Sequence, residues 1–328
     1  MQKKNIAVVY GGYSSENVVS RKSAQGVVSF LDPERYNIYP VEITADDWLV
    51  ELPTGMKIPI DKNDFSFTCN GEKAKFALAY ITIHGTPGEN GLLQGYFDMV
   101  GVPYSCCGVL AAAVTFNKYV CNQYLSGFGF HVAKSMRLLR GDEVVPARIV
   151  EAVGLPCFIK PNQGGSSFGT TKVKSVEEVQ AAVDAAFAED NEVVIESFLA
   201  GTEVSCGCFR TLEGTTVLPI TEVVSKNEFF DYEAKYTASK VEEITPARIP
   251  DEQTAEIQRL TARIYDLLGC KGIIRADYII VSGTPYLLEV NTTPGMTPTS
   301  FIPQQVRAAG LDIRRVMTDI IETELARR

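Results

Sequence analysis

Residues 273–291 read IIRADYIIVSGTPYLLEVN, and this stretch decides the fold. Its two halves are rich in β-branched and aromatic residues, which favour strands. Between them, residues 282–284 (Ser-Gly-Thr) can form a three-residue turn, with glycine available for the left-handed conformation. The stretch therefore predicts a β-hairpin of two long antiparallel strands.

The register of this hairpin brings four polar residues together. If the hairpin is symmetric about Gly283, the opposed pairs are Asp277 with Glu289 and Arg275 with Asn291. Side chains alternate along a strand, so all four project from one face. The other face then carries the apolar residues Ala276, Tyr278, Leu288 and Val290.

Two directly opposed carboxylates destabilise a sheet unless a positive charge lies between them. Oxygen ligands from Asp277, Glu289 and Asn291 suit Mg²⁺, which takes few protein ligands and completes its shell with phosphate and water. Arg275 is placed to meet a phosphate or a developing oxyanion. The competing interpretation is a solvated sheet face with an ordinary ion pair.

A second motif, residues 160–169, reads KPNQGGSSFG. A lysine ends a predicted strand over 157–160, and a further strand is predicted over 170–173. Glycine lets backbone N–H groups approach phosphate oxygens, and the hydroxyls of Ser166 and Ser167 add donors. The Gly-Lys-Ser/Thr ending of a Walker P-loop is absent, so we expect a β-loop-β phosphate lid. A flexible hairpin without a ligand is the alternative.

Residues 196–203 (ESFLAGTE) follow a predicted strand over 193–195. An extended segment entering a turn offers backbone groups to an adenine edge, and Glu203 could accept hydrogen bonds from ribose hydroxyls. Taken alone, the segment is more typical of a connection between domains than of a nucleotide site.

The rest of the chain predicts an α/β protein with three domains, at residues 1–106, 107–200 and 201–328. In the first domain, strands over 5–9, 36–43 and 77–83 alternate with helices, which favours a parallel sheet. The first helix is expected to be capped by Ser14 or Ser15, and Asn70-Gly71 predicts a hairpin. Further helices are predicted over 92–100, 110–125, 176–187, 253–268 and from about 312.

Composition excludes several classes of protein. The net charge is −9 over 328 residues and no basic block occurs, which disfavours nucleic acid and anionic membranes as partners. No apolar run approaches the roughly 18 residues of a membrane span, and the N-terminus lacks a signal sequence, so we expect a cytoplasmic protein. Eight cysteines without a Cys-x-x-Cys pair, and two histidines, indicate reduced thiols and disfavour a zinc site.

These motifs, in this order, resemble the ATP-grasp family, whose nucleotide lies between the central and C-terminal domains. Five stretches narrow the resemblance to D-alanine–D-alanine ligases and together run along essentially the whole chain. They are Gly11–Ser20, His84–Gly95, Lys160–Gly169, Phe230–Ala247 and Leu287–Thr297.

The resemblance implies ATP, two Mg²⁺ (which Mn²⁺ could replace), two D-alanine substrates, a homodimer, and a role for each matching residue. Glu16, with Ser166 and Tyr236, would hold the ammonium of the first D-alanine, and His84 would line its pocket. Contacts to ATP would come from Lys118, Lys160, Ser166, Ser167, Glu196, Leu199, Glu203 and Lys235. Asp277, Glu289 and Asn291 would bind the metal. Arg275 and the N–H of Gly295 would form the oxyanion site, with Ser300 and Phe301 at the second D-alanine.

Two positions depart from the family pattern, since Phe168 replaces a frequent Val and Phe301 a frequent Leu. Three other functions remain open. The first is a D-alanyl-D-lactate ligase, against which the pair Lys235-Tyr236 argues. The second is a different ATP-grasp carboxylate–amine ligase, against which the motifs at residues 84–95 and 287–297 argue. The third is a nucleotide-binding regulatory protein without turnover, which predicts the loss of a metal ligand or phosphate lysine, and all of these are present in the sequence.

Overall fold

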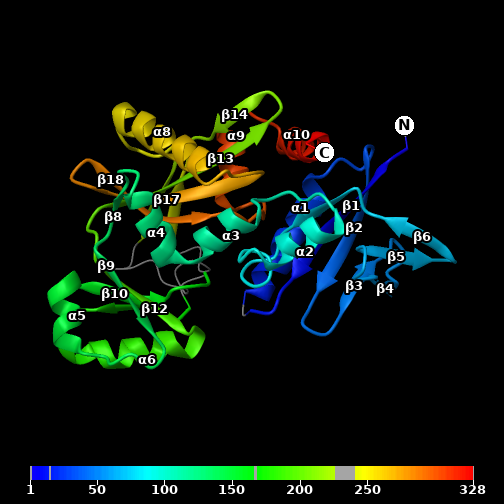
Figure 1. Ribbon diagram of the computed structural model, residues 1–328. Coiled ribbons are helices and arrows are strands. Elements are labelled where there is room, and N and C mark those ends of the chain that lie inside the picture. The colour runs from blue at the N-terminus through cyan, green and yellow to red at the C-terminus, as the bar shows by residue number, and fades with distance from the viewer. Residues whose placement is uncertain (1, 15, 166–167, 226–240, 328) are drawn as a thin grey trace.

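The computed structural model describes residues 2–14, 16–165, 168–225 and 241–327. In this part of the chain, three large β-sheets and their helices form three lobes. Figure 1 shows the N-terminal lobe (blue to cyan) on the right, the central lobe (green) below left, and the C-terminal lobe (mainly yellow to red) above it. The mixed α/β architecture expected from the sequence is confirmed.

The N-terminal lobe is built on β1 (Lys4–Gly11), whose second half is buried throughout. It lies between β2 (Tyr36–Ile43) and β7 (Leu78–Ile81), and both pair with it in parallel. The carboxyl ends of these strands therefore meet at one edge, where loops form binding sites. The lobe also contains α1 (Asn17–Phe30), β3 (Trp48–Glu51), β4 (Lys57–Pro59), β5 (Ser66–Cys69), β6 (Glu72–Lys75) and α2 (Leu92–Val100).

Two local predictions for this lobe have different outcomes. The hairpin at Asn70-Gly71 is confirmed, with φ angles of 52° and 82° joining β5 to β6. The predicted cap at Ser14 is wrong, because Glu16 occupies the N-cap position of α1. Ser15, the other candidate, lies outside the described residues.

The central lobe is a four-stranded sheet in which β10 (Cys157–Pro161) pairs antiparallel with β11 (Thr171–Val173). The glycine- and serine-containing loop connects these two strands, so the predicted β-loop-β arrangement is confirmed. The backbone N–H of Ser197 donates to the carbonyl of Lys134 at 2.9 Å, so the chain enters and leaves this lobe at one place. Its other elements are β9 (Ser135–Leu139), α5 (Pro146–Val153), η1 (Val176–Glu178), α6 (Val179–Glu189) and β12 (Glu192–Ser197).

The C-terminal lobe carries the largest sheet, in the order β16-β15-β13-β17-β18-β8, with β14 paired to β13. Its strands are β8 (His131–Val132), β13 (Thr202–Thr211), β14 (Gly214–Val217), β15 (Thr221–Ser225), β16 (Val241–Ile244), β17 (Ile273–Val281) and β18 (Thr284–Asn291). Its helices are α8 (Asp251–Leu267), α9 (Phe301–Ala308) and α10 (Ile313–Ala326).

The deciding hairpin, β17 with β18, forms with a shorter turn than expected. Val281 pairs with Thr284, which leaves Ser282 and Gly283 as a two-residue turn with φ angles of 48° and 85°. Positive φ at both positions is the signature of the type I′ turn, which matches the twist of the strands. The predicted three-residue loop is therefore wrong.

A β-bulge at Leu288 compensates for the shorter turn. The extra residue in β18 restores both predicted pairs, Asp277 with Glu289 and Arg275 with Asn291. The bulge also changes which leucine is buried: Leu287 packs in the core beside Tyr278, whereas Leu288 lines the cleft described below. The prediction that Leu288 belongs to the apolar face is therefore wrong.

The helix predicted over 110–125 is two helices, α3 (Val109–Phe116) and α4 (Lys118–Ser126). Asn117 separates them in an extended conformation, and its side chain accepts from the N–H of Val120 at 2.9 Å. Asparagine favours such caps over a helix interior because its side chain competes for backbone groups.

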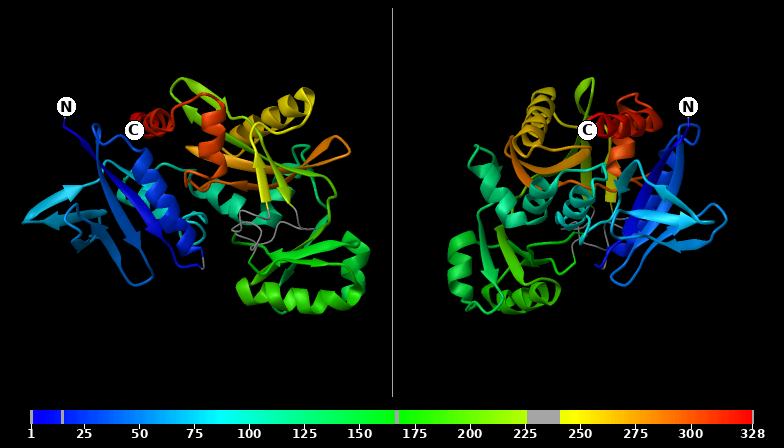
Figure 2. Two further views of the ribbon diagram at one scale, coloured as in Figure 1. Left: turned by 180° about the vertical axis from the view of Figure 1, so that it is seen from behind. Right: turned by 45° about the vertical axis from the view of Figure 1, so that its right-hand side comes forward.

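Apolar packing links the lobes unequally. Cys107, Cys121 and Leu125 share a core with the C-terminal sheet, so we propose to count residues 107–132 with that lobe; the other domain limits stay a prediction. A second core joins Ile6 and Val27 of the N-terminal lobe to α9 and α10. Figure 2 shows the two chain ends close together, where Lys4 Nζ lies 2.6 Å from Glu322 Oε2.

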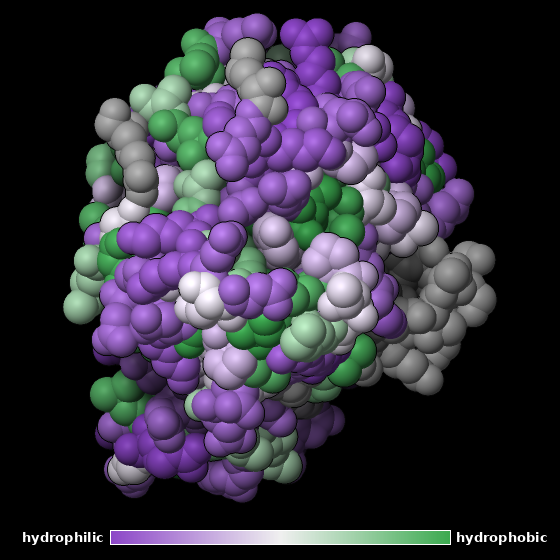
Figure 3. Space-filling model, turned by 90° about the vertical axis from the view of Figure 1, so that its right-hand side faces the viewer, coloured by the Kyte–Doolittle hydropathy of each residue, from purple (hydrophilic) through white to green (hydrophobic). Residues whose placement is uncertain are grey.

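The surface is mixed in character. Figure 3, which faces the N-terminal lobe, shows hydrophobic areas scattered among hydrophilic ones. Over the residues that the structure describes, none of the helices combines the length and the apolar character that crossing a bilayer requires.

Candidate active site

All three lobes contribute to one cleft of about 1370 Å³. Every predicted site residue that the structure describes lines it. These are Glu16, His84, Lys118, Lys160, Glu196, Leu199, Glu203, Arg275, Asp277, Glu289, Asn291, Gly295, Ser300 and Phe301. Ser166, Ser167, Lys235 and Tyr236 lie outside the described residues.

The hairpin of β17 and β18 forms one wall of the cleft. Arg275 binds Asp277 in a forked contact, with Nε to Oδ1 at 2.9 Å and Nη2 to Oδ2 at 2.7 Å. Its Nη2 also lies 4.0 Å from Glu289. Burial alone would lower the pKa of Arg275, but the Asp277 carboxylate outweighs it and the pKa is raised. Arg275 therefore supplies the positive charge that two opposed carboxylates need.

The donor set on this wall fits a hard divalent cation. Asp277 also accepts from Ser205 Oγ at 2.6 Å, and Asn291 Oδ1 accepts from the N–H of Thr293 at 2.9 Å. Both contacts fix the direction of the ligand oxygens while leaving lone pairs for a metal. Two carboxylates and one amide oxygen on a single face match the few protein ligands that Mg²⁺ uses.

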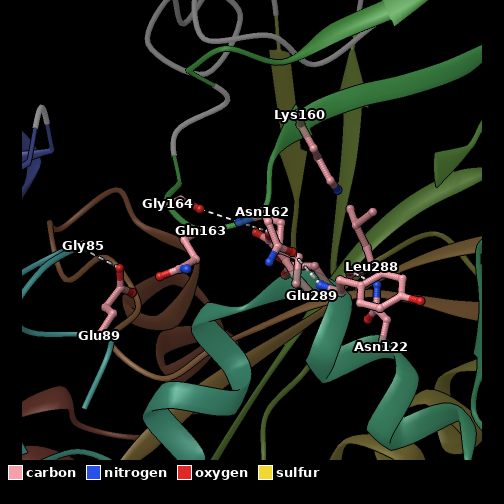
Figure 4. Close-up of polar contacts among 12 residues, drawn as sticks. Gly85, Glu89, Asn122, Lys160, Asn162, Gln163, Gly164, Leu288 and Glu289 are labelled. Atoms are coloured by element: carbon pink, nitrogen blue, oxygen red, sulfur yellow. Dashed lines mark hydrogen bonds and ion pairs between the residues drawn. The ribbon is translucent and has the colours of Figure 1, made fainter. Parts of the chain in front are cut away.

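Two lysines line the cleft on the side of the loop that joins β10 to β11, the predicted phosphate lid, which is called the phosphate loop below. Lys160 Nζ lies 2.6 Å from Glu196 Oε2. Burial acts to lower the pKa of Lys160, but this carboxylate outweighs it, so the pKa is raised and the lysine stays charged. Lys118 Nζ donates to the carbonyl of Gly164 in the loop and lies 4.0 Å from Glu289. Figure 4 shows Lys160, Gly164 and Glu289 around this region.

The N-terminal lobe closes the opposite end. Glu16 is 6% exposed, and a Cβ built on Gly165 would lie 2.6 Å from its Oε1, so Glu16 touches the phosphate loop. The His84 ring Nε2 lies 3.0 Å from Ser23 Oγ. Burial, and then the charge of Arg275, lower the pKa of His84 to about 4, so the ring is neutral near pH 7.

The loop after β18 completes the cleft. Ser300 Oγ accepts from the N–H of Thr297 at 3.0 Å, and a Cβ built on Gly295 would lie 3.1 Å from the same oxygen. The ring of Phe301 lies 5.3 Å from the guanidinium carbon of Arg275. This cation–π contact further restrains the guanidinium of Arg275.

Sequence reasoning missed three polar residues near the cleft. Glu89 accepts from the N–H of Gly85 at 2.6 Å (Figure 4), and burial together with the nearby Glu16 raises its pKa. Asn122 Nδ2 reaches Glu196 Oε1 at 3.3 Å and the carbonyl of Leu288 at 3.4 Å. Asn162 joins the phosphate loop to α4. Glu89 and Asn162 lie in quoted motifs and could have been found; Asn122 carries no sequence signal.

Comparison with known proteins agrees with this geometry. The family model described as "D-ala D-ala ligase N-terminus" matches residues 5–107, and the one described as "D-ala D-ala ligase C-terminus" matches residues 125–322. The chain belongs to the D-alanine–D-alanine ligase family. The resemblance that five short motifs first indicated therefore extends over both the N-terminal and the C-terminal parts of this chain.

Individual relatives support the same assignment. The D-alanine–D-alanine ligase of Phocaeicola vulgatus is 62% identical over 98% of this chain and 99% of its own length. The crystal structure of the VanG D-Ala:D-Ser ligase from Enterococcus faecalis has a TM-score of 0.86 at 32% identity, over 98% of this chain and 100% of its own. The crystal structure of the D-alanine–D-alanine ligase from Bacillus anthracis complexed with ATP has a TM-score of 0.79 at 30% identity, over 99% of this chain and 98% of its own.

Proposed function

We propose that the protein joins two D-alanines into D-alanyl-D-alanine, at the expense of ATP, for peptidoglycan precursor synthesis. The observation that carries this proposal is the wall of β17 and β18, where Arg275, Asp277, Glu289 and Asn291 face one cleft. That wall suits phosphoryl transfer, which needs positioning and charge neutralisation more than a covalent nucleophile.

ATP would occupy the side between the central and C-terminal lobes. Glu196, Leu199 and Glu203 would contact adenine and ribose, and Lys118 and Lys160 would contact the phosphates. Ser166, Ser167 and Lys235 would close over the phosphates. Asp277, Glu289 and Asn291 would hold Mg²⁺, in two sites. Bound there, the metal would neutralise charge on the transferring phosphoryl group.

The first D-alanine would bind at the N-terminal end of the cleft. Its ammonium fits the carboxylate of Glu16, with Ser166 and Tyr236 as further contacts, and His84 would line the pocket. Because Glu89 meets Glu16 across Gly85, we add it to this pocket as a second acidic group. A buried pair of acids disfavours two negative charges and so favours an arriving cation.

The reaction would proceed in two steps. The carboxylate of the first D-alanine attacks the γ-phosphorus, which gives an acyl phosphate and ADP. The free amine of the second D-alanine, held near Ser300 and Phe301, then attacks the carbonyl carbon. Arg275 and the N–H of Gly295 would stabilise the tetrahedral oxyanion, and phosphate leaves as the peptide bond forms. Exclusion of water by the closed cleft would protect the acyl phosphate.

Acceptor choice, assembly and location are also proposals. Lys235-Tyr236 supports an amine acceptor over D-lactate, and the similarity to a D-Ala:D-Ser ligase makes D-serine the acceptor to compare. Exposed apolar side chains on α2 and α3, namely Leu92, Met99, Val109 and Leu110, are compatible with a homodimer. The cytoplasmic location expected from the sequence stays a proposal, which membership of the ligase family supports.

ADP release tests the proposal directly. The protein is incubated with ATP and Mg²⁺ plus D-alanine, L-alanine, D-alanine with D-serine, or D-alanine with D-lactate. We expect ADP to be released when D-alanine is the only amino acid added. Mass spectrometry should then identify D-alanyl-D-alanine as the product. Release only with another amino acid would discard the substrate, and no release with any amino acid would discard the ligase activity.

A further inference from the structure

Asn162 is the first residue after β10 and is completely buried, with 0% exposure. All its polar groups are paired. Its backbone N–H donates to the carbonyl of Glu192 at 2.9 Å, and its carbonyl accepts from the N–H of Lys118 at 3.1 Å. Its Oδ1 accepts from the N–H of Tyr119 at 2.9 Å, and its Nδ2 donates to Glu192 Oε2 at 2.8 Å.

These contacts determine the orientation of the amide. Oδ1 faces an N–H donor and Nδ2 faces a carboxylate, so only an uncharged side chain with one acceptor and one donor satisfies both. Aspartate would place a carboxylate against Glu192, and alanine would leave buried groups without partners.

The two backbone donors belong to the first turn of α4, whose N–H groups have no partner within the helix. The carbonyl and Oδ1 of Asn162 accept from the N–H groups of Lys118 and Tyr119, and Oδ1 of Asn117 accepts from the N–H of Val120. The start of α4 is thus capped from two separate segments of the chain. The N–H groups of Lys118 and Tyr119 therefore bind Asn162 at the start of the phosphate loop, so they are not available to bind a phosphate.

Helix α4 is in turn fixed to the metal-binding wall. Asn122 in α4 donates to the carbonyl of Leu288 in β18 at 3.4 Å, and Lys118 lies 4.0 Å from Glu289. Lys118 also donates to Gly164 in the loop. Figure 4 shows Asn162 and Gly164 of the loop, Asn122, and Glu289 and Leu288 of β18 gathered in one region.

We propose that Asn162 is a positioning residue that holds the root of the phosphate loop at a fixed distance from Glu289 and Asn291. It touches no reacting atom in this role, which rests on the proposed ATP-dependent function. Because the phosphates must meet the loop and the wall together, a displaced root weakens nucleotide binding. Binding of D-alanine should change less, because most of its proposed contacts, Glu16 and His84 among them, lie outside the loop.

The test uses three variants: Asn162→Ala, Asn162→Asp, and Asn162→Asp with Glu192→Gln. In the double variant a glutamine amide donates to the new aspartate, and the net charge equals that of the natural protein. Recovery of nucleotide binding in the double variant is expected to be partial, because the same Glu192 oxygen also accepts from Asn117 and Arg137, both at 3.4 Å. Glu192→Gln alone is the control.

The readouts are the KM for ATP, the KM for D-alanine, and direct binding of a fluorescent ATP analogue, which needs no turnover. In Asn162→Ala and Asn162→Asp we expect the KM for ATP to rise by about tenfold, the effect of roughly one buried hydrogen bond. The KM for D-alanine should rise clearly less, by about threefold at most, since Ser166 is the one proposed D-alanine contact within the loop. The double variant should bind the analogue more tightly than Asn162→Asp.

An unchanged KM for ATP in Asn162→Ala would overturn the proposal. So would a double variant no better than Asn162→Asp, or equal rises in both KM values, which would indicate general loss of structure. If Asn162→Asp does not fold, the comparison of Asn162→Ala with the natural protein decides. Absence of turnover in the natural protein would instead reject the proposed function.

Discussion

At the scale of single residues, His84 is a buried neutral group whose ring would be charged in the unfolded chain at mildly acidic pH. Its pKa is about 4 in the folded protein against 6.5 in the reference state. Between these values the unfolded state binds more protons, so the free energy of unfolding falls as pH falls, by up to about 1.4 kcal/mol per pH unit. Above pH 6.5 this contribution is absent.

We therefore expect His84→Gln to lose less stability than the natural protein between pH 6.5 and pH 4.5. The measurement is Tm at several pH values for both proteins. The exposed His131 is the matched control, and His131→Gln should follow the natural protein. Parallel Tm curves for His84→Gln and the natural protein would show that the ring is not held neutral.

Glu289 provides the second prediction at this scale. Glu289→Gln keeps the size of the side chain but removes one carboxylate of the proposed metal site. Turnover with Mg²⁺ should fall by about 100-fold or more, since charge neutralisation supplies several kcal/mol in phosphoryl transfer. Steady-state kinetics against Mg²⁺ concentration measures this effect.

The control for Glu289→Gln is Glu42→Gln, which also breaks close ion pairs (to Arg21 and Lys57) but lies outside the cleft. This variant should keep its turnover. Normal Mg²⁺-dependent activity in Glu289→Gln would remove Glu289 from the metal site.

At the scale of elements, α1 is packed directly against the loop that carries Gly295. A Cβ on Gly26 would lie 2.0 Å from the carbonyl oxygen of Met296, so this loop and this helix can approach only with glycine between them. Gly26→Ala should cost roughly 1–3 kcal/mol of stability and reduce turnover, because the Gly295 N–H, which we propose stabilises the oxyanion, moves with the loop.

Gly95 in α2 is a matched control, because a Cβ there meets only Val109 Cγ2, at 3.8 Å. Gly95→Ala should be neutral or stabilising by up to about 1 kcal/mol, as alanine is the better helix former. Denaturant unfolding of both variants separates the two cases. Equal stability of the two variants would contradict the close packing of α1.

The elements also show which parts of the fold can be predicted from the sequence. Runs of β-branched and aromatic residues predicted β17 and β18, and glycine-containing stretches predicted the phosphate loop and the hairpin at Asn70-Gly71. The turn at Ser282-Gly283 was missed, because a two-residue turn plus a bulge at Leu288 gives the same site pairs as a three-residue turn. The break at Asn117 was missed too, since its cap depends on backbone geometry. Likewise, the contacts of Asn162 join segments far apart in sequence.

At the scale of the whole molecule, the lobes have unequal cores. The N-terminal and C-terminal lobes share one apolar core, whereas, among the residues that the structure describes, the core of the central lobe contains only its own, between Met136 and Ile195. The central lobe should therefore open separately and at lower free energy than the rest. Hydrogen exchange of peptides within residues 138–195 measures this opening.

A nucleotide bridging the central and C-terminal lobes should suppress that opening. At an ATP concentration of 100 times Kd, the bound state gains about 2.7 kcal/mol. D-alanine alone, placed mainly at the N-terminal end, should slow exchange in the central lobe much less than ATP does. Uniform exchange across all three lobes, with or without ATP, would contradict the separate opening.

The hydrogen bond between Lys134 and Ser197 has a consequence for how such a chain could arise. Because the two ends of the central lobe are adjacent, residues 135–196 form an insertion, and a short turn could replace them without stretching the backbone. A module of this kind can be exchanged between related chains or gained in a single genetic event. The cap on α4 made by Asn162 is then one of the docking contacts that such a graft would have to reproduce.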